Sequence, residues 1–362
     1  MDIHEGYMRR CFDLARMGEG FTAPNPMVGA VLVHDGRIIG EGFHARYGEV
    51  HAEVNAVRSV KPEDRQLLPH STLYVSLEPC CIHGRTPPCT SLILQKKIPE
   101  VLVSVLDYTA EVKGRGVEIL RNNGVKVTTG VLAEEGAELS IIRNTFVAKR
   151  RPYIALKFAQ SADGFMGVPG RQVWISNKYS KRLSHKLRNR FAAILVGTNT
   201  ALTDDPSLDN RLWYGSTPVK ILLDRKLKVP DSAKLFHSPG SSIVVCEAKP
   251  NTTDYPDTVA FLELAFDEHL LDRLLEHLAV KNISSLLVEG GAKILEQFIK
   301  RDLWDEAWVF TSEKRLGGGI PAPFVPGTEV QQFHLGNDRV EVLHAIDRRE
   351  FSSKIAMLSA TG

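Results

Sequence analysis

The segment 78–89 reads EPCCIHGRTPPC and contains three of the chain's five cysteines. Residues 72–77 before it, TLYVSL, have the apolar and β-branched composition of a buried strand, and residues 90–97 after it follow the spacing of a helix. A strand, a loop and a helix in this order make the repeating unit of an α/β layered domain. Cysteines clustered in the loop of such a unit, in a long chain with an odd cysteine count, indicate a metal site or catalysis rather than disulfides.

The same alternation continues on both sides of this segment, and it predicts one α/β domain with helices packed on a sheet. The elements that we expect are a helix around 8–15, a hairpin over 30–39, a helix at 52–60, a strand at 101–106, a helix at 116–123, a strand at 125–127 and one helix over 133–150.

A second α/β series begins with an apolar strand at 153–158. Its further elements are a helix at 178–190, strands near 192–197, 219–223 and 242–246, a helix at 267–279, a strand at 284–288, a helix at 292–300 and a strand at 306–311. The whole chain has 362 residues, more than the ~100–150 typical of one domain. We therefore expect two domains, residues 1–150 and 151–362.

Composition narrows the class of protein. Hydrophobic residues make up 43% and charged residues 24%, which is typical of a folded globular chain. The net charge is +2 and each predicted domain is nearly neutral, so we expect no nucleic-acid partner. No apolar run approaches the ~18 residues of a membrane span, and the acidic start does not resemble a signal peptide. We expect a cytoplasmic protein without a membrane partner.

His51, Cys80 and Cys89 form a candidate zinc site, because one imidazole and two thiolates suit this borderline-soft ion. An open fourth position would keep a water whose pKa falls toward ~7, and Glu53 is placed to take its proton. This is the arrangement of the zinc nucleobase deaminases, although eight residues separate the two cysteines here instead of two. The alternative is a structural zinc site in which Cys81 or His83 is the fourth ligand.

The second predicted domain has no dinucleotide fingerprint and no Walker A sequence. Gly290-Gly291 instead ends a strand and opens the predicted helix 292–300, where free backbone N–H groups favour a phosphate. The helix 178–190 carries six basic and no acidic residues, so it is either a solvated face or a source of guanidinium groups for a substrate phosphate.

These motifs closely resemble the bifunctional diaminohydroxyphosphoribosylaminopyrimidine deaminase / 5-amino-6-(5-phosphoribosylamino)uracil reductase family of riboflavin biosynthesis. The first domain contributes the segments 22–29 (TAPNPMVG), 42–44 (GFH), 51–53 (HAE) and 78–89, whose long insert between the cysteines is itself typical of that family. The second contributes 157–164 (KFAQSADG), 174–176 (WIS), 197–206 (GTNTALTDDP) and 288–291 (VEGG). The resemblance covers about the first 320 residues and implies a cytidine-deaminase-like α/β/α domain followed by a dihydrofolate-reductase-like α/β domain.

In the first domain the resemblance implies His51, Cys80 and Cys89 as ligands of one Zn²⁺ per chain and Glu53 as the catalytic proton shuttle. It further implies that the pocket for the deaminase substrate is lined by Asn25, His44, His83 and Arg85. The family usually has a Pro-Asn-Pro-like segment where this chain has 108–110, YTA.

In the second domain the resemblance implies NADPH as cofactor. Cofactor contacts are expected from Gln160, Trp174, Thr200, Asp204, Gly291, Ala292, Lys293, Ile294, Leu295, Glu296 and Gln297. Contacts to the reductase substrate are expected from Lys157, Gln172, Arg188, Leu208, Arg211 and Glu289. Gln160 and Gln172 stand where the family usually has small residues. Arg225 follows the predicted strand 219–223 and is our candidate for the 2′-phosphate of NADPH, with a solvated turn residue as the alternative.

We therefore expect a bifunctional enzyme, a zinc hydrolase and an NADPH-dependent oxidoreductase, acting on small phosphorylated pyrimidines as a homo-oligomer. It would deaminate 2,5-diamino-6-(5-phosphoribosylamino)pyrimidin-4(3H)-one and then reduce the ribosyl chain to give 5-amino-6-(5-phosphoribitylamino)uracil. The alternatives are a deaminase of another nucleobase with an unrelated second domain, and a zinc-containing module that binds nucleic acid without catalysis.

Overall fold

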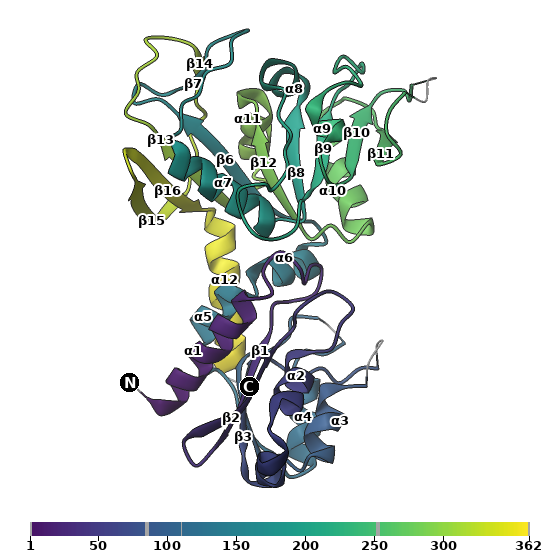
Figure 1. Ribbon diagram of the computed structural model, residues 1–362, viewed down its shortest axis with the longest axis vertical. Helices are drawn as coiled ribbons and strands as arrows, with labels where there is room; N and C mark the ends of the chain where they lie inside the picture. The colour runs from purple at the N-terminus through teal and green to yellow at the C-terminus, as the bar shows by residue number, and fades with distance from the viewer. Residues whose placement is uncertain (1, 84–86, 110, 251–253, 361–362) are drawn as a thin grey trace. The chain divides into compact units, whose positions relative to one another are not determined.

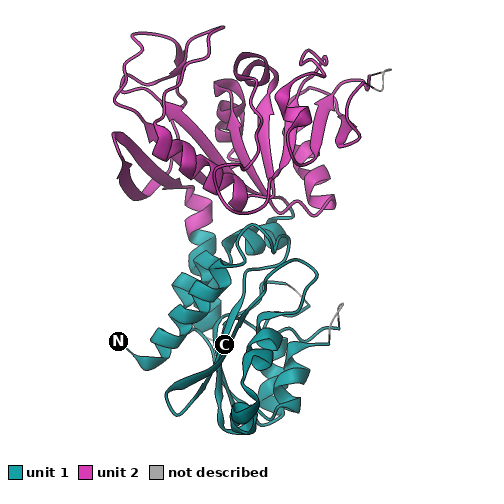
Figure 2. Ribbon diagram, viewed as in Figure 1, with its two compact units in different colours: residues 1–150, 350–362 teal, residues 151–349 magenta. Residues whose placement is uncertain are grey.

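The chain divides into two compact units, as a computed structural model shows for residues 2–83, 87–109, 111–250 and 254–360 (Figures 1 and 2). Unit 1 contains residues 1–150 and 350–362, and unit 2 contains residues 151–349. Our expected second domain, 151–362, differs from unit 2 in its last residues. The cause is the C-terminal helix α12 (Ile346–Ala360), whose later turns bury Ile355, Ala356 and Ser359 within unit 1.

Unit 1 is built on a five-stranded sheet with the strand order β2-β1-β3-β4-β5. Its strands are β1 (Gly29–His34), β2 (Arg37–Phe43), β3 (Thr72–Leu77), β4 (Glu100–Val105) and β5 (Lys126–Thr128). Its helices are α1 (Ile3–Arg16), α2 (Ala52–Ser59), the 3₁₀ helix η1 (Pro62–His70), α3 (Cys89–Gln95), α4 (Arg115–Asn122), α5 (Ala133–Leu139) and α6 (Ile141–Lys149). Strands β1 and β2 form the expected hairpin, and β3, β4 and β5 are parallel.

Helices cover both faces of this sheet, with α2, α3 and α4 on one face and α1 and α5 on the other (Figure 1). The predicted α/β/α architecture is thereby confirmed. Strands β3 and β4 read as nearly continuous apolar runs because both their faces are buried. The prediction of one helix over 133–150 was wrong, since the backbone leaves helical geometry at Ser140 (φ −96°, ψ 1°) and separates α5 from α6.

Unit 2 is built on a nine-stranded sheet with the order β11-β10-β9-β8-β12-β6-β13-β16-β15. Its strands are β6 (Tyr153–Gln160), β8 (Ala193–Gly197), β9 (Val219–Leu223), β10 (Ser242–Cys246), β11 (Val259–Glu263), β12 (Ser285–Gly290), β13 (Glu306–Thr311), β15 (Thr328–Leu335) and β16 (Asp338–His344). The first seven strands of that order are parallel, and β16 and β15 continue the sheet in antiparallel pairing. A separate two-stranded ribbon pairs β7 (Phe165–Gly167) with β14 (Ile320–Pro321).

The helices of unit 2 are α7 (Lys178–Arg190), α8 (Thr198–Asp204), α9 (Lys234–His237), α10 (Leu270–Val280) and α11 (Ala292–Lys300). Apolar side chains of β6, β8, β12, α10 and α11 form its hydrophobic core. Ligands of open parallel sheets gather at the carboxyl ends of the strands, so the ends of β6, β8, β9 and β12 are where a site is expected. Among the described residues, no helix is long and apolar enough to cross a membrane.

Candidate active sites

A cluster of one histidine and two cysteines forms beyond the carboxyl end of β3, the middle strand of the unit 1 sheet. His51 is the N-cap of α2, Cys80 follows β3, and Cys89 is the first residue of α3. The Nδ1 atom of His51 lies 3.3 Å from the Cys89 sulfur and 3.4 Å from the Cys80 sulfur. Three potential ligand atoms thus converge within 4.8 Å of one another, which fits a zinc ion.

The donor set also has the chemistry that zinc requires. Hydrogen bonds from Cys89 and His51 together lower the pKa of the Cys80 thiol to about 4, against the effect of burial. A thiolate at neutral pH is the form that binds metal. Among the described residues Cys81 and His83 are not part of the cluster, and the His83 side chain is exposed. Three protein ligands without a fourth are typical of a catalytic zinc site and not of a structural one.

Glu53 lies in the first turn of α2, two residues beyond His51, and is only 4% exposed. Burial, with a smaller contribution from the neighbouring Cys80 sulfur, raises the pKa of its carboxyl to about 7. A carboxyl with a pKa near the working pH can both accept and return a proton.

Asn25 and His44 lie beside this cluster. The Nδ1 atom of His44 lies 3.1 Å from the carbonyl oxygen of Val50, so this nitrogen donates the hydrogen bond. Its Nε2 atom therefore accepts from the Asn25 amide at 3.1 Å. The His44 ring meets the His51 ring edge-on, with 5.7 Å between centroids. The structure thus brings Asn25 and His44 to the metal cluster. His83 makes no contact with the cluster among the residues that the structure describes, and Arg85 lies outside those residues.

Glu78, to which the sequence assigned no role, lies two residues before Cys80 and holds the backbone at Asp107 and at the start of α4. Its buried carboxylate accepts hydrogen bonds from four backbone N–H groups, those of Asp107, Gly114, Gly116 and Val117, at 2.8–3.3 Å. A glutamate directly after a buried strand was the available signal for such a role.

A second cluster lies in unit 2, between β6, β12 and α7. Arg188 of α7 forms a two-pronged ion pair with Glu289 of β12, at 2.8 and 3.0 Å, and also donates to the carbonyl of Asp209 at 3.1 Å. Lys157 of β6 interacts electrostatically with both charged groups. Burial disfavours the charged form of Glu289, but Arg188 and Lys157 outweigh it and lower the pKa of this carboxyl to about 2. Three of the predicted substrate residues are therefore brought together.

Two further predicted substrate residues border this cluster. Arg211 forms an ion pair with Asp209, and Leu208 is buried directly before Asp209 with φ of 54°. Two residues of this cluster were not predicted from the sequence, Asp209 and His185. The His185 side chain is 1% exposed and interacts electrostatically with Arg188. The i, i+3 spacing of His185 and Arg188 on one helix was the signal that could have revealed it.

Most of the predicted cofactor residues lie beyond the carboxyl ends of β8 and β12, in α8 and in the turn and helix that begin at Gly291. Gly291 has φ of 84° and lies so close to Thr200 that a Cβ atom would be 3.2 Å from its hydroxyl oxygen. It precedes α11, whose first turns contain the predicted positions 292–297. Gln172, a predicted substrate residue, donates to the carbonyl oxygen of Asp204 at 3.1 Å.

The remaining cofactor candidates show separate contacts. Trp174 is 62% exposed with Lys181 over its ring at 4.8 Å. Gln160 donates to the Thr311 hydroxyl at 3.1 Å. Arg225 follows β9 and forms an exposed ion pair with Glu247 at 2.6 Å. These contacts do not join the three residues into one cluster.

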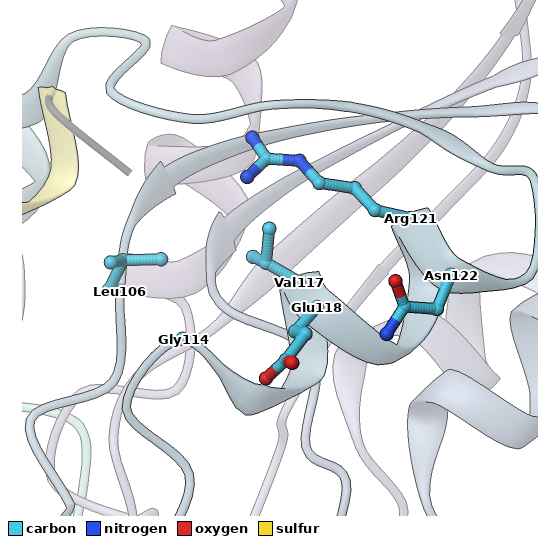
Figure 3. Close-up of a pocket in the computed structure, with 6 residues that line it drawn as sticks. All are labelled: Leu106, Gly114, Val117, Glu118, Arg121 and Asn122. Carbon is cyan, nitrogen blue, oxygen red and sulfur yellow. The ribbon is translucent and has the colours of Figure 1, made fainter.

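A pocket of about 180 Å³ lies elsewhere in unit 1, beside α4 (Figure 3). It is lined by Leu106, Gly114, Val117, Glu118, Arg121 and Asn122. None of these lining residues was predicted for either site, so this pocket is distinct from both clusters.

The two units together define a class of protein: a two-domain α/β enzyme with a zinc-dependent hydrolytic site in one domain and a dinucleotide-type site at the strand ends of the other. Comparison with known families agrees with each half. Residues 1–105 match the cytidine and deoxycytidylate deaminase zinc-binding region, and residues 152–345 match the RibD C-terminal domain.

Whole-chain relatives show that both halves belong to one family. The riboflavin biosynthesis protein RibD of Aquifex aeolicus is 39% identical over 322 residues, covering 88% of this chain and 89% of the relative. The RibD protein of Escherichia coli is 33% identical over 333 residues, covering 86% and 88%. The chain belongs to the RibD family of riboflavin biosynthesis, the family that its motifs resemble.

Solved structures agree. A diaminohydroxyphosphoribosylaminopyrimidine deaminase/5-amino-6-(5-phosphoribosylamino)uracil reductase from Thermotoga maritima has a TM-score of 0.87 and 36% identity, covering 95% of this chain and 99% of that one. RibD of Acinetobacter baumannii has a TM-score of 0.85 and 30% identity, covering 94% and 98%. The chain is therefore a bifunctional deaminase and reductase that uses zinc and NADPH. The alternative of a deaminase with an unrelated second domain is wrong, because the relatives match both domains.

Proposed function

We propose that unit 1 hydrolyses the 2-amino group of 2,5-diamino-6-(5-phosphoribosylamino)pyrimidin-4(3H)-one, and that residues 151–349 reduce the ribosyl chain of the product. The observation that carries the first assignment is the convergence of His51, Cys80 and Cys89 beside the buried Glu53. The second rests on the cluster of Lys157, Arg188 and Glu289 near the glycine turn before α11.

In the deamination step the protein positions water, base and leaving group. One imidazole and two thiolates would hold the zinc ion, which would supply activation of a water molecule at neutral pH. Glu53 takes a proton from the attacking water and hands it to the departing amine, so that the C–N bond breaks, the water oxygen stays on the ring as a carbonyl and the amino group leaves as ammonia. The Asn25 side-chain nitrogen donates to His44, so its side-chain oxygen is on the other side of the amide. That oxygen is the atom that would accept from a pyrimidine N–H.

In the reduction step the ribose ring C–O bond opens, a hydride from NADPH reaches the carbon and a proton reaches the oxygen. Burial lowers the pKa of the Lys157 ammonium, which favours release of a proton, while the charge of Glu289 opposes the shift. Arg188 and Arg211 offer guanidinium groups suited to a substrate phosphate. The protein otherwise holds cofactor and substrate in line.

We propose phosphorylated pyrimidines as the only partners of the sites, with no nucleic acid and no membrane surface involved. All five cysteines are free thiols, two of them in the zinc cluster, which supports a reducing compartment such as the cytoplasm. A homo-oligomer stays a prediction, and the molar mass in solution tests it.

One experiment tests both assignments. The purified chain should contain one zinc per chain, release ammonia from the diaminopyrimidine and then oxidise NADPH in the same tube. Supplying the deaminated intermediate should give NADPH oxidation without ammonia release. Zinc without NADPH oxidation on that intermediate would leave only the assignment of unit 1.

A further inference from the structure

Residues 350–360 belong to unit 1 although they follow the whole of unit 2 in sequence (Figure 2). They form the later turns of α12 and carry no motif of either chemistry. Their buried side chains, Ser352, Ile355, Ala356 and Ser359, face the deaminase unit. Two of their contacts reach the chain directly after β4.

Ser359 holds the first residue after β4. Its hydroxyl oxygen accepts a hydrogen bond from the backbone N–H of Leu106 at 3.0 Å and donates to the carbonyl of Ile355 at 3.0 Å. Ser359 has no exposed surface, so water cannot replace its hydroxyl. The Leu106 N–H is only partly exposed, so loss of its acceptor would be costly, and the position of Leu106 therefore depends on this serine.

Phe351 holds the next turn of the same segment. Its ring meets the ring of Tyr108 edge-on, with 5.2 Å between centroids, a favourable aromatic geometry. Ser352 beside it donates to the carboxylate of Glu138 on α5 at 2.6 Å. The close fit of α12 extends to its end, where a Cβ atom on Gly130 would lie 2.8 Å from the Cα atom of Ala360.

The segment held in this way is the one that fixes Glu78. The carboxylate of Glu78 accepts from the N–H of Asp107 at 3.1 Å, and its own N–H donates to the carbonyl of Val105 at 2.9 Å. Glu78 stands two residues before Cys80. A continuous series of contacts thus runs from Ser359 and Phe351, through residues 105–108 and Glu78, to the metal cluster.

We propose that Ser359 and Phe351 are positioning residues of the deaminase: they touch neither substrate nor zinc, but hold residues 106–108 and so set the backbone that carries Cys80. This inference rests on the proposed function of unit 1. On this inference the C-terminal helix, which follows the reductase in sequence, supports the deaminase site from outside it.

The test uses the full chain with Ser359→Ala, and with Ser353→Ala as a matched control, because Ser353 is an exposed serine on the same helix. For Ser359→Ala we expect the deaminase kcat per zinc-loaded site to fall roughly tenfold, as an unsatisfied, partly buried N–H implies. Zinc should be lost to a chelator at lower chelator concentration than in the control. The reductase rate on the deaminated intermediate, measured in the same preparation, should not change.

A second pair of variants guards against a simple folding defect. Phe351→Ala should reproduce the selective loss of deaminase activity, and Phe351→Tyr, which keeps the ring, should restore it. A lower unfolding temperature with an unchanged deaminase kcat per zinc-loaded site would overturn the inference, since the residues would then serve stability alone. Equal losses of both activities would also overturn it. A wild-type chain without zinc or deamination would instead contradict the proposed function.

Discussion

At the residue scale, the two cysteines and Glu53 should fail in different ways. Cys80→Ser or Cys89→Ser removes one of three ligand atoms, so zinc affinity should fall by more than the ~10–100-fold typical of outer-shell changes, and deamination should cease. Glu53→Gln leaves the ligands intact, so zinc should stay while kcat falls by ~10²–10⁴-fold. Metal analysis beside ammonia assays measures both. Cys81→Ser is the control that should keep zinc and activity, and depleted zinc in Glu53→Gln would contradict this division of roles.

Arg225 is a second residue with a specific expectation. NADPH differs from NADH by a 2′-phosphate, which an arginine at the end of β9 can bind. Its ion pair with Glu247 is exposed to solvent, so this pair contributes little to stability and leaves the Arg225 guanidinium available. Arg225→Ala should raise the KM for NADPH by roughly ten- to hundredfold and leave the KM for NADH nearly unchanged. Lys228→Ala, a neighbouring exposed cation, is the control, and equal effects on both cofactors would remove Arg225 from the 2′-phosphate.

His185 predicts a pH dependence of stability. Burial, together with the nearby Arg188 and Arg211, lowers the pKa of its imidazole from 6.5 to about 4, against the opposing effect of Glu289 and Asp209. The unfolded chain therefore binds a proton at higher pH than the folded chain, so stability should fall as the pH drops from 6.5 to 4. Urea unfolding of His185→Leu should show a weaker fall over this range. An identical pH dependence in both proteins would mean that His185 does not titrate in this way.

At the scale of elements, α7 should depend on its N-cap. The Asn177 side chain accepts from the N–H groups of Tyr179 and Ser180 and donates to the carbonyl of Leu335 on β15 at 2.6 Å. Asn177→Ala should lower the free energy of unfolding by about 1–3 kcal/mol, measured in urea, because it removes both the cap and a strand contact. Asn177→Ser keeps the capping oxygen and should recover part of the loss. Equal stabilities of the two variants would show that the cap contributes nothing.

The elements that sequence predicted well are those whose burial leaves a regular pattern, which is one buried face for a helix and a continuous buried run for an inner parallel strand. The strand expected at 219–223 and the helices expected at 178–190 and 292–300 agree with β9, α7 and α11 to the residue. The antiparallel strands β15 and β16 were not predicted. β15 (TEVQQFHL) lies at the sheet edge and is largely exposed, whereas β16 (DRVEVLH) alternates buried and more exposed residues, a signal that was missed. An edge strand needs no regular apolar alternation, and periodicity therefore cannot reveal it.

The candidate sites divide in the same way. The ligand set was predictable because zinc requires particular donor atoms, and His51, Cys80 and Cys89 are a rare combination in one α/β unit. Glu78 and Ser359 act through backbone N–H groups, which any residue possesses. The identity of Leu106 or Asp107 does not indicate that its backbone N–H donates to a side chain distant in sequence. These contacts could therefore be found only in the structure.

At the scale of the whole molecule, the two units have separate hydrophobic cores, one around α1, β1 and β3 and the other around β6, β8 and β12. The boundary after residue 150 was visible in sequence because a new strand starts there. The return of residues 350–360 to unit 1 was not visible, since contacts so far apart in sequence leave no local pattern. A cut at residue 151 would therefore take part of unit 1 away with unit 2.

Separate cores predict that the two chemistries can be uncoupled in the intact chain. The metal cluster lies wholly in unit 1, and the charged cluster of Lys157, Arg188 and Glu289 lies wholly in unit 2. Removing zinc from the full chain with a chelator should therefore abolish ammonia release and leave NADPH oxidation on the deaminated intermediate unchanged. Both rates are measured on one preparation, and added zinc should restore deamination. A fall of NADPH oxidation in step with the zinc content would show that unit 2 depends on the folded metal site, because its own core would then not suffice to hold the reductase in its active form.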